Sequence, residues 1–524
     1  MQTPTNKNDP NFGELKNIHT LFSENKFTDT KNYILNILPN YPNSAILFNV
    51  LGLIDYNLKD YSSAKQKYCK AIELNPNFPD PLNNIGMVDR LLGNYQDAIS
   101  AFKRSIMIKP DFSQAYFNLA NLYLQISDFS EAEINYKLAL KINPNFTQAS
   151  QNLGATFLKM GQKADAAKIF ASALEFSPTD TNVLLSLGGV HKDMGELHQS
   201  LNCYEKILGN NSDHAEAFAR WMSIKVQLGD YSSINNALIF HVSKSLAEKL
   251  DDHPRYQIYK SIYHFISRDL TSCRYHLEKF AHLKLMGETS SLSKKNLQFC
   301  NAFYDILKQL IKKFSGSDLK PNDKVFHFGE SHCLSFAHCS IANNSLEKYI
   351  TPVITFGAKA FHFSTPENNS FKAITAQNLN RIPKNSDVFL SFGEIDCRLS
   401  EGIIVAQKKT NEKIKTLVEK TVDGYVKWFL GTNIKNNHSF WFFNVPAPVF
   451  RNDRSSGENE TVAEVVKLFN ERLAAILEKN QLRLIDMYSE TNNNLGFSNL
   501  KHHIDGIHLG HSVITEIERQ FFTD

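Results

Sequence analysis

The stretch NFPDPLNNIGMVDRLLGNYQDAISAFKRSIMIKP, residues 77–110, decides the fold of the first half of the chain, because the next 34 residues repeat its pattern. Residues 111–144, DFSQAYFNLANLYLQISDFSEAEINYKLALKINP, place alanine, tyrosine and proline where the first stretch has glycine, phenylalanine and proline. A fixed period of about 20 to 50 residues is the sequence mark of a repeat architecture, in which stacked units bury a continuous core.

Four kinds of position recur every 34 residues in one register. Prolines recur at Pro42, Pro76, Pro110, Pro144 and Pro178. One column of small residues is Gly52, Gly86, Ala120, Gly154 and Gly188, and a second is Ala64, Ala98, Ala132, Ala166 and Ser200. The aromatic column is Tyr68, Phe102, Tyr136, Phe170 and Tyr204. Small residues let two antiparallel helices approach closely, the aromatic ring fills the groove beside them, and proline ends the second helix.

This pattern resembles the tetratricopeptide repeat (TPR) in its period and in every signature position. The resemblance implies a right-handed α-solenoid of six units from about Asn11 to His214, whose concave surface binds a protein or peptide. Asn84, Asn118 and Asn152 share one position on the concave side, and in some relatives such an asparagine ladder grips an extended peptide. Asparagine is also common there in ordinary repeats, so both interpretations stay open.

The pattern divides the chain into five segments. Residues 1–10 are polar and expected to be disordered, and residues 11–240 form the solenoid. Residues 241–314 have apolar residues at three- and four-residue steps and are expected to form a helical extension. Residues 315–323 have the Ser, Gly, Pro and Asp content of a linker, and residues 324–524 form a second domain.

In the second domain, short apolar runs alternate with helical patterns. Strands are expected at Lys324–Phe328, Val388–Phe392, Phe440–Val445 and Arg483–Ile485. Helices are expected at Asn411–Leu430, Glu460–Asn480 and Ser512–Phe522. This alternation predicts a mainly parallel sheet covered on both faces, with reactive groups where strands end. The predicted fold class is therefore α followed by α/β.

Three polar motifs stand at strand ends or before the last helix. VFHFGES ends in Ser331, VFLSFGEIDCR holds a glycine and three charged residues, and HHIDGIHLG places Asp505 three residues before His508. A serine hydroxyl becomes a nucleophile when an imidazole removes its proton, and a carboxylate holds that imidazole in the right tautomer. These residue types therefore point to nucleophilic chemistry.

The order and spacing of the motifs resemble the SGNH/GDSL hydrolase superfamily over about 200 residues. The resemblance implies a flavodoxin-like three-layer α/β/α domain. It makes Ser331 the nucleophile, His508 the general base and then acid, and Asp505 the orienting group. It also implies oxyanion or substrate positions at Gly357, Gly393, Glu394, Asp396 and Arg398.

One position departs from this family. Ile395 stands where the family has an oxyanion-hole asparagine, and it has no donor. Losing such a donor typically costs about 3 to 4 kcal/mol, or roughly a hundred- to a thousand-fold in rate. Arg398 is a candidate replacement, or a holder of an anionic substrate group. Glu394, Asp396 and Arg398 equally fit a buried ion-pair network, and the sequence does not choose between these roles.

Composition narrows the function classes. A net charge of +3 gives no reason to expect nucleic acid, and no apolar run reaches the roughly 18 residues of a membrane span. The seven cysteines are scattered and the N-terminus has no signal-peptide core, so a cytoplasmic location is expected. No metal or cofactor is expected, because no zinc-ligand spacing occurs among His327, His332, Cys333, His338 and Cys339.

The sequence thus predicts a TPR-recruited serine esterase or O-acyltransferase-like protein. Its substrate would be an ester-bearing small molecule or glycan, with an O-acetyl sugar preferred by the family resemblance. The alternative is a non-catalytic TPR binding or scaffold protein with a degenerate SGNH-like domain. The Ser331, Asp505 and His508 set favours the enzyme, and Ile395 favours the alternative.

Overall fold

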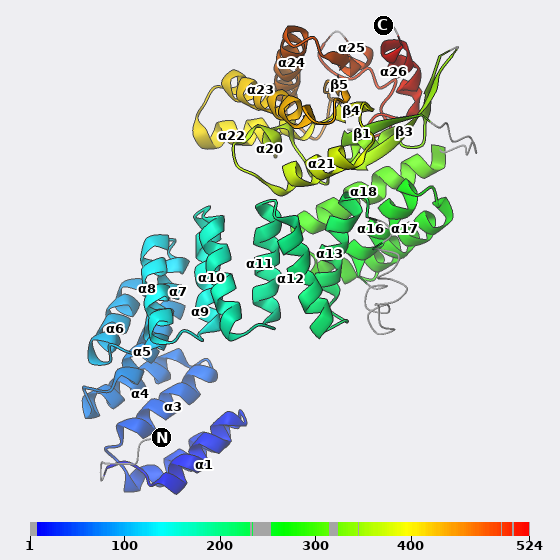
Figure 1. Cartoon of the computed structure of the whole chain (residues 1–524). Coiled ribbons are helices and arrows are strands. Elements are labelled where there is room, and N and C mark those ends of the chain that lie inside the picture. Colours follow the sequence, from blue (N-terminus) through cyan, green and yellow to red (C-terminus); the bar gives the residue numbers. More distant parts are fainter. Residues whose placement is uncertain are drawn as a thin grey trace. The chain divides into compact units, whose positions relative to one another are not determined.

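The computed structural model describes residues 8–230, 233, 253–313, 323–343, 345–493, 495–505 and 508–522. The chain divides into two compact units, Met1–Leu187 and Gly188–Asp524 (Figure 1). Most of the expected disordered N-terminus and of the expected linker (residues 1–7 and 314–322) lies outside the described residues, as does the junction of solenoid and extension (231–232 and 234–252).

The first unit is an array of helix pairs. Its helices are α1 (Phe12–Ser23), α2 (Phe27–Ile37), α3 (Ala45–Asn57), α4 (Tyr61–Leu74), α5 (Pro79–Leu91), α6 (Tyr95–Ile108), α7 (Ser113–Gln125), α8 (Phe129–Ile142), α9 (Thr147–Lys159), α10 (Lys163–Phe176) and most of α11 (Thr181–Asp193). Helices α12 (Leu197–Asn210) and α13 (Ala215–Gln227) continue the alternation into the second unit. The predicted helical repeat array is confirmed.

The small and aromatic columns meet within each helix pair. A Cβ atom on Gly52 would lie 2.5 Å from the ring of Tyr68, and one on Gly86 would lie 2.6 Å from the ring of Phe102. Both rings are fully buried. Because protein interiors are close-packed, the missing side chain of each glycine is the space that the ring occupies.

The proline column lies just beyond the second helix of each pair. Helix α6 ends two residues before Pro110 and α8 ends two residues before Pro144. Proline has no backbone N–H to continue the helical hydrogen bonds, so the chain turns into the next pair here, as predicted.

The second unit contains a mixed six-stranded sheet of order β2-β3-β1-β4-β5-β6. Its strands are β1 (Lys324–Gly329), β2 (Ser340–Ala342), β3 (Glu347–Ile354), β4 (Asp387–Ser391), β5 (Ser439–Phe443) and β6 (Arg483–Ile485). All neighbours are parallel except β2, which runs antiparallel to β3. The four predicted strands are present, whereas β2 and β3 were not predicted.

Helices account for most of the rest of this unit. They are α16 (Pro254–Ile266), α17 (Leu270–Leu285), α18 (Lys294–Lys313), α19 (His332–Ser335), α20 (Ala360–Ser364), α21 (Ser370–Arg381), α22 (Gly402–Thr410), α23 (Ile414–Asn433), α24 (Ser456–Lys479), α25 (Met487–Thr491) and α26 (Ile514–Phe521). Across the described ranges, no helix has both the length and the apolar character needed to cross a bilayer.

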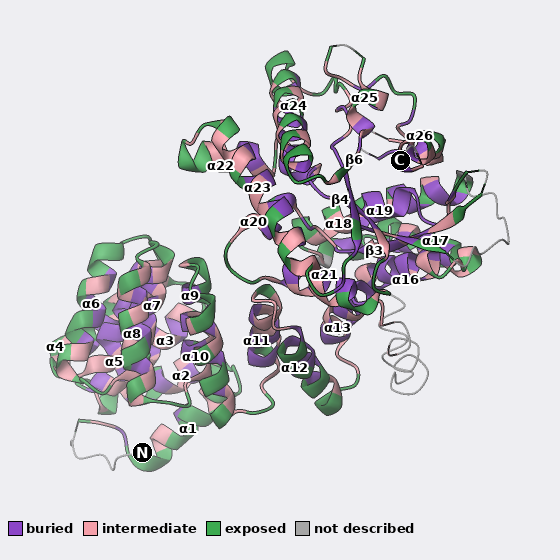
Figure 2. Cartoon of the chain, turned by 45° about the horizontal axis from the view of Figure 1, so that its top comes forward, coloured by how far each residue is buried: buried purple, intermediate pink, exposed green. Residues whose placement is uncertain are grey.

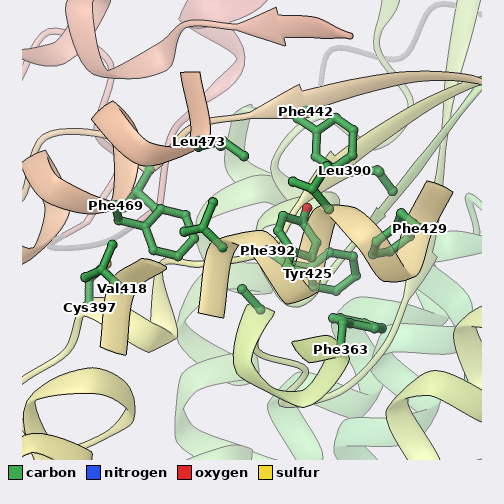
Figure 3. Close-up of a cluster of buried hydrophobic side chains, with 14 of the residues drawn as sticks. Phe363, Leu390, Phe392, Cys397, Val418, Tyr425, Phe429, Phe442, Phe469 and Leu473 are labelled. Carbon is green, nitrogen blue, oxygen red and sulfur yellow. The ribbon is translucent and has the colours of Figure 1, made fainter. Parts of the chain in front are cut away.

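Apolar side chains pack against both faces of the sheet. One cluster joins Leu390 and Phe442 of the strands to Phe429 of α23 (Figure 3). The other joins Phe389 to Phe521 of α26. Successive strand residues point to opposite faces, so Phe389 and Leu390 enter different clusters and the central strands are buried (Figure 2).

Helices α16 and α18 pack directly on the α/β part of the second unit. Phe356, just beyond β3, packs against three aromatic rings of α16 and α18, those of Tyr259, Phe299 and Phe303. His338 Nε2 lies 2.6 Å from the carbonyl oxygen of Phe265, at the end of α16. These helices and the sheet therefore share one compact unit.

Candidate active site

The carboxyl ends of the parallel strands meet at one edge of the sheet. Gly329, the last residue of β1, lies in register with Ile354 of β3 and Ser391 of β4. The backbone N–H of Thr355 donates to the carbonyl oxygen of Gly329 at 2.8 Å. The loops that carry the polar motifs therefore begin side by side, where open α/β sheets bind ligands.

Ser331, His508 and Asp505 form a hydrogen-bonded row at this edge. Ser331 Oγ lies 2.9 Å from His508 Nε2, although the two residues are 177 positions apart. His508 Nδ1 lies 2.8 Å from Asp505 Oδ2, and the backbone N–H of His508 donates to Asp505 Oδ1 at 2.6 Å. Ser331 and His508 are each 5% exposed. The three predicted residues are thus brought together.

The two imidazole contacts assign the tautomer of His508. A carboxylate only accepts, so Nδ1 carries the hydrogen that Asp505 accepts. Nε2 is then the acceptor for the hydroxyl of Ser331. This arrangement can move the serine proton to the imidazole while the carboxylate stabilises the resulting positive charge.

Glu330 makes an additional contact that sequence analysis did not assign. Its Oε2 accepts the backbone N–H of Ser331 and also contacts the hydroxyl oxygen, so it competes with His508 Nε2 for the one hydroxyl hydrogen. A backbone N–H at this position could stabilise a developing oxyanion, but here Glu330 occupies the donor. The only sequence signal is that Glu330 adjoins Ser331.

The glycine loop after β3 is held from the helical side. Gly357 has a φ of +69°, which favours glycine, and no heavy atom lies within 4 Å of where its Cβ would be. The preceding residue, Phe356, donates its backbone N–H to Gln227 Oε1 of α13 at 2.9 Å. The predicted oxyanion position, Gly357, therefore has open space beside it, and Gln227 fixes the loop that carries it.

Glu394 and Arg398 form a close ion pair. Arg398 Nε lies 3.0 Å and 2.9 Å from the two carboxylate oxygens, and Nη2 lies 2.5 Å from Oε2. Burial alone would raise the pKa of Glu394, but the Arg398 guanidinium outweighs it and lowers that pKa. The Nε and Nη2 atoms of Arg398 thus donate to Glu394, within the protein.

Asp396 and Gly393 hold the same loop in place. The carboxylate of Asp396 accepts backbone N–H groups of Ala360 at 2.7 Å and Phe361 at 3.1 Å. Burial raises the pKa of Asp396 to about 6, against these two hydrogen bonds. Gly393 has a φ of +128°, and a Cβ there would lie 2.6 Å from Phe469. These contacts give Asp396 and Gly393 a structural role in holding this loop.

A cavity of about 230 Å³ is lined by the loops after β4 and β5 and by His503, which belongs to the same loop as Asp505 and His508. Its polar lining residues include Glu394, Arg398, Ser400, Arg451, Arg454 and His503. The segment after β5 supplies the wall from Val445 to Val449. Arg451 and Arg454 stand three residues apart in an irregular loop, and no sequence motif marks them.

The crowded histidines and cysteines have separate partners. His327 Nε2 lies 2.8 Å from Ser391 Oγ, and burial lowers the pKa of His327 to about 3. His338 bridges Phe265 and the hydroxyl of Tyr349. In the part of the chain that the structure describes, no three His, Cys, Asp or Glu residues are grouped to hold a metal ion.

The asparagine ladder is joined to neighbouring asparagines. Nδ2 of each ladder residue donates to an Oδ1 at 3.0, 2.9 and 2.8 Å, pairing Asn84 with Asn49, Asn118 with Asn83, and Asn152 with Asn121. Asn84 also lines a groove cavity of about 480 Å³ in the first unit. Each amide has a second N–H, and peptide binding by this row stays a proposal.

Comparisons with known proteins identify the repeats. The tetratricopeptide-repeat family models match residues 45–78, 79–112 and 113–146. No curated protein matches the chain.

Several solved structures resemble part of the chain. A MamA protein is 20% identical, covering 33% of this chain and 94% of its own, with a TM-score of 0.30. YrrB, described as a TPR protein with an unusual peptide-binding site, is 18% identical, covering 35% and 95%, with a TM-score of 0.29. PilF of Pseudomonas aeruginosa is 15% identical, covering 41% and 96%, with a TM-score of 0.35. The helix pairs and the family match together show that the N-terminal part of this chain carries tetratricopeptide repeats.

Proposed function

We propose that the α/β part is an SGNH-type serine hydrolase or O-acyltransferase acting on an ester, and that the tetratricopeptide repeats recruit a protein or peptide partner. The observation that carries the proposal is the 2.9 Å contact of Ser331 Oγ with His508 Nε2, together with Asp505 on the other imidazole nitrogen. A nucleophile, a base and an orienting carboxylate are the parts that acyl transfer needs.

The sheet supports the family assignment. With β2 set aside, the parallel strands run β3-β1-β4-β5-β6. Numbered in chain order this is 2-1-3-4-5, the flavodoxin-like order, in which ligands bind beyond the carboxyl ends of the strands. Ser331 follows β1 at that edge.

The proposed reaction proceeds in two balanced steps. Ser331 Oγ attacks the acyl carbon as its proton passes to His508 Nε2, and the tetrahedral oxyanion then expels the alcohol, which takes that proton. Water, or a second alcohol in the transferase case, attacks the acyl-serine as His508 again accepts and returns a proton. Asp505 stays ionised throughout and stabilises the imidazolium.

Stabilising the oxyanion requires a rearrangement at Glu330. Its carboxylate must leave the backbone N–H of Ser331, because a negative charge there opposes the developing oxyanion. The open face of the Gly357 loop is the second place from which a backbone donor can act. Ile395 contributes no side-chain donor.

The second candidate function is a binding protein without turnover. The occupied backbone N–H of Ser331 and the apolar Ile395 favour it, since both remove oxyanion stabilisation. The repeats would then be the main functional part.

Labelling and turnover separate the two functions. The whole chain is treated with a fluorophosphonate probe and with short p-nitrophenyl esters, in wild-type, Ser331→Ala and Ser335→Ala forms. Ser335 is buried at the end of α19, the short helix that Ser331 precedes, and serves as the matched serine control. The enzyme requires activity that is lost in Ser331→Ala and kept in Ser335→Ala. A wild type as inert as Ser331→Ala towards probe and esters supports the binding protein.

A further inference from the structure

The cavity next to the serine site is built from three parts of the second unit. The loop after β4 supplies Glu394 and Arg398, the loop after β5 supplies Arg451 and Arg454, and the last loop supplies His503. His503 belongs to the same loop as Asp505 and His508, and both of these residues lie close enough to His503 to influence its pKa. The cavity therefore adjoins the Ser331 row.

Its lining carries more positive than negative charge. Three guanidinium groups face one carboxylate, that of Glu394, which is already paired with Arg398. Arg451 pairs with Asp453 at 3.0 Å and 2.8 Å. Burial lowers the pKa of His503 to about 4, which keeps its ring neutral at pH 7.

Arg454 is the third arginine of the cavity, and unlike Arg398 and Arg451 it has no carboxylate partner in the described ranges of the chain. Among the described residues, its side chain makes neither a hydrogen bond nor an ion pair. The nearby carboxylate of Glu458 is committed to Ser455, whose backbone N–H it accepts at 2.9 Å. Burial and then Arg451 lower the pKa of Arg454, and the nearby carboxylates of Asp453, Glu458 and Glu394 offset this only in part.

We propose that Arg454, aided by Arg451, holds an anionic group of the substrate in this cavity, so that the ester substrate is an acidic molecule. A guanidinium presents a planar fork of donors that matches a carboxylate, sulfate or phosphate. The valine and proline walls at Val445, Pro446 and Val462 suit the carbon frame beside that group. The cavity is smaller than the roughly 300 Å³ of most drug-sized pockets, which fits one small acidic group.

The part of this inference that concerns an ester rests on the proposed function, whereas anion binding is measured separately. Isothermal titration calorimetry of the whole chain uses inorganic phosphate, sulfate and succinate in turn, which distinguishes the oxoanion classes. The variants are Arg454→Gln, Arg451→Gln and, as the matched control, Arg472→Gln, an arginine of α24 that pairs with Asp423.

Wild type is expected to bind at least one of these anions, and Arg454→Gln to weaken binding by about tenfold or more, since hydrogen bonds to charged groups are the strong ones. Arg451→Gln should weaken binding less, and Arg472→Gln should not change it. Absence of binding by wild type, or equal binding by folded Arg454→Gln, overturns the inference. Circular dichroism checks folding, and if Arg454→Gln is unfolded then Arg454→Lys, which keeps the charge but loses the fork, takes its place.

Steady-state kinetics test whether the bound anion belongs to the ester substrate. Turnover of mono-p-nitrophenyl succinate, which carries a free carboxylate, is compared with that of p-nitrophenyl acetate. Arg454→Gln should lower the succinate-to-acetate ratio of kcat/KM. Anion binding that persists in Ser331→Ala while no ester is turned over by wild type would refute the hydrolase and leave the anion site standing.

Discussion

The side-chain oxygen of Gln227, at the end of α13, accepts a 2.9 Å hydrogen bond from the backbone N–H of Phe356, 129 positions later in the chain. The carbonyl oxygen of Gln227 accepts a second hydrogen bond from Asn378 Nδ2 at 2.7 Å. A helix that continues the repeat pattern thus fixes the loop that contains Gly357.

Replacing Gln227 by leucine should loosen that loop. The buried N–H of Phe356 would lose its partner, which costs about 1 to 3 kcal/mol. Hydrogen exchange of a peptide spanning residues 355–358 should become faster, while peptides from β6 keep their protection. Under the proposed function, ester turnover should fall as well. Unchanged exchange around Phe356 would show that the aromatic contacts alone hold the loop.

Asp505→Asn should impair the proposed chemistry without unfolding the site. The amide oxygen can still accept the backbone N–H of His508, but an amide cannot stabilise the imidazolium. In a serine triad the equivalent change lowers kcat by about 10⁴. The rate of fluorophosphonate labelling measures this, with Asp423→Asn as the exposed control. Equal labelling rates in wild type and Asp505→Asn would remove the aspartate from the mechanism.

Glu330→Ala should increase activity if the serine is a nucleophile. The change frees the backbone N–H of Ser331 for the oxyanion and removes a nearby negative charge. One oxyanion donor is worth about 10²- to 10³-fold in rate, which sets the upper limit of the gain. Turnover of p-nitrophenyl acetate is compared with that of Glu347→Ala, which removes an exposed carboxylate from β3. A lower rate in Glu330→Ala would instead give the carboxylate a direct catalytic role.

His338 should contribute stability that depends on pH. Burial lowers its pKa to about 4, so the folded state keeps the ring neutral while the unfolded chain protonates it below its usual pKa of 6.5. Its contribution is therefore complete above pH 6.5 and is lost as the pH falls from 6.5 to 4, by about 3 kcal/mol. Arg268 and His511 are the nearby charged or titratable groups that also lower this pKa.

The measurement is urea unfolding followed by tryptophan fluorescence. The three tryptophans, Trp221, Trp428 and Trp441, all belong to the second unit and so report on it. In His338→Gln, the unfolding free energy should vary less between pH 6.5 and 4 than in wild type. His327 and His503 still titrate in both proteins, so the difference isolates His338. Parallel pH profiles would contradict this assignment.

The sequence predicted the features that depend on local pattern. The repeat was visible because glycine and an aromatic ring must occupy paired positions, as Gly86 and Phe102 do. Strand β6 was predicted at its observed bounds, since its short apolar run follows the end of a long helical pattern. The predicted contact of Ser331 with His508 is present. Ser331 follows the end of β1, and the last loop brings His508 to the same edge of the sheet. Their catalytic roles remain a prediction.

Strand β3 was missed because Pro352 interrupts its pattern. Proline cannot donate to a neighbouring strand, so within a run it argues against a central strand. In the structure β2 pairs only with residues 347–349 of β3, so Pro352 lies where that side of β3 has no β2 partner. Contacts such as that of Gln227 with Phe356 join distant, patternless positions, and no local rule anticipates them.

The packing of Phe356 against α16 and α18 determines how this protein can be divided. A fragment begun at residue 323 would leave the Phe356 ring facing water, without Tyr259, Phe299 and Phe303 to cover it. Such a fragment would aggregate for reasons unrelated to its chemistry. A gene truncation that preserves the serine site should therefore begin before α13, whose Gln227 also holds this loop, and exchange of repeats between proteins should stop there too.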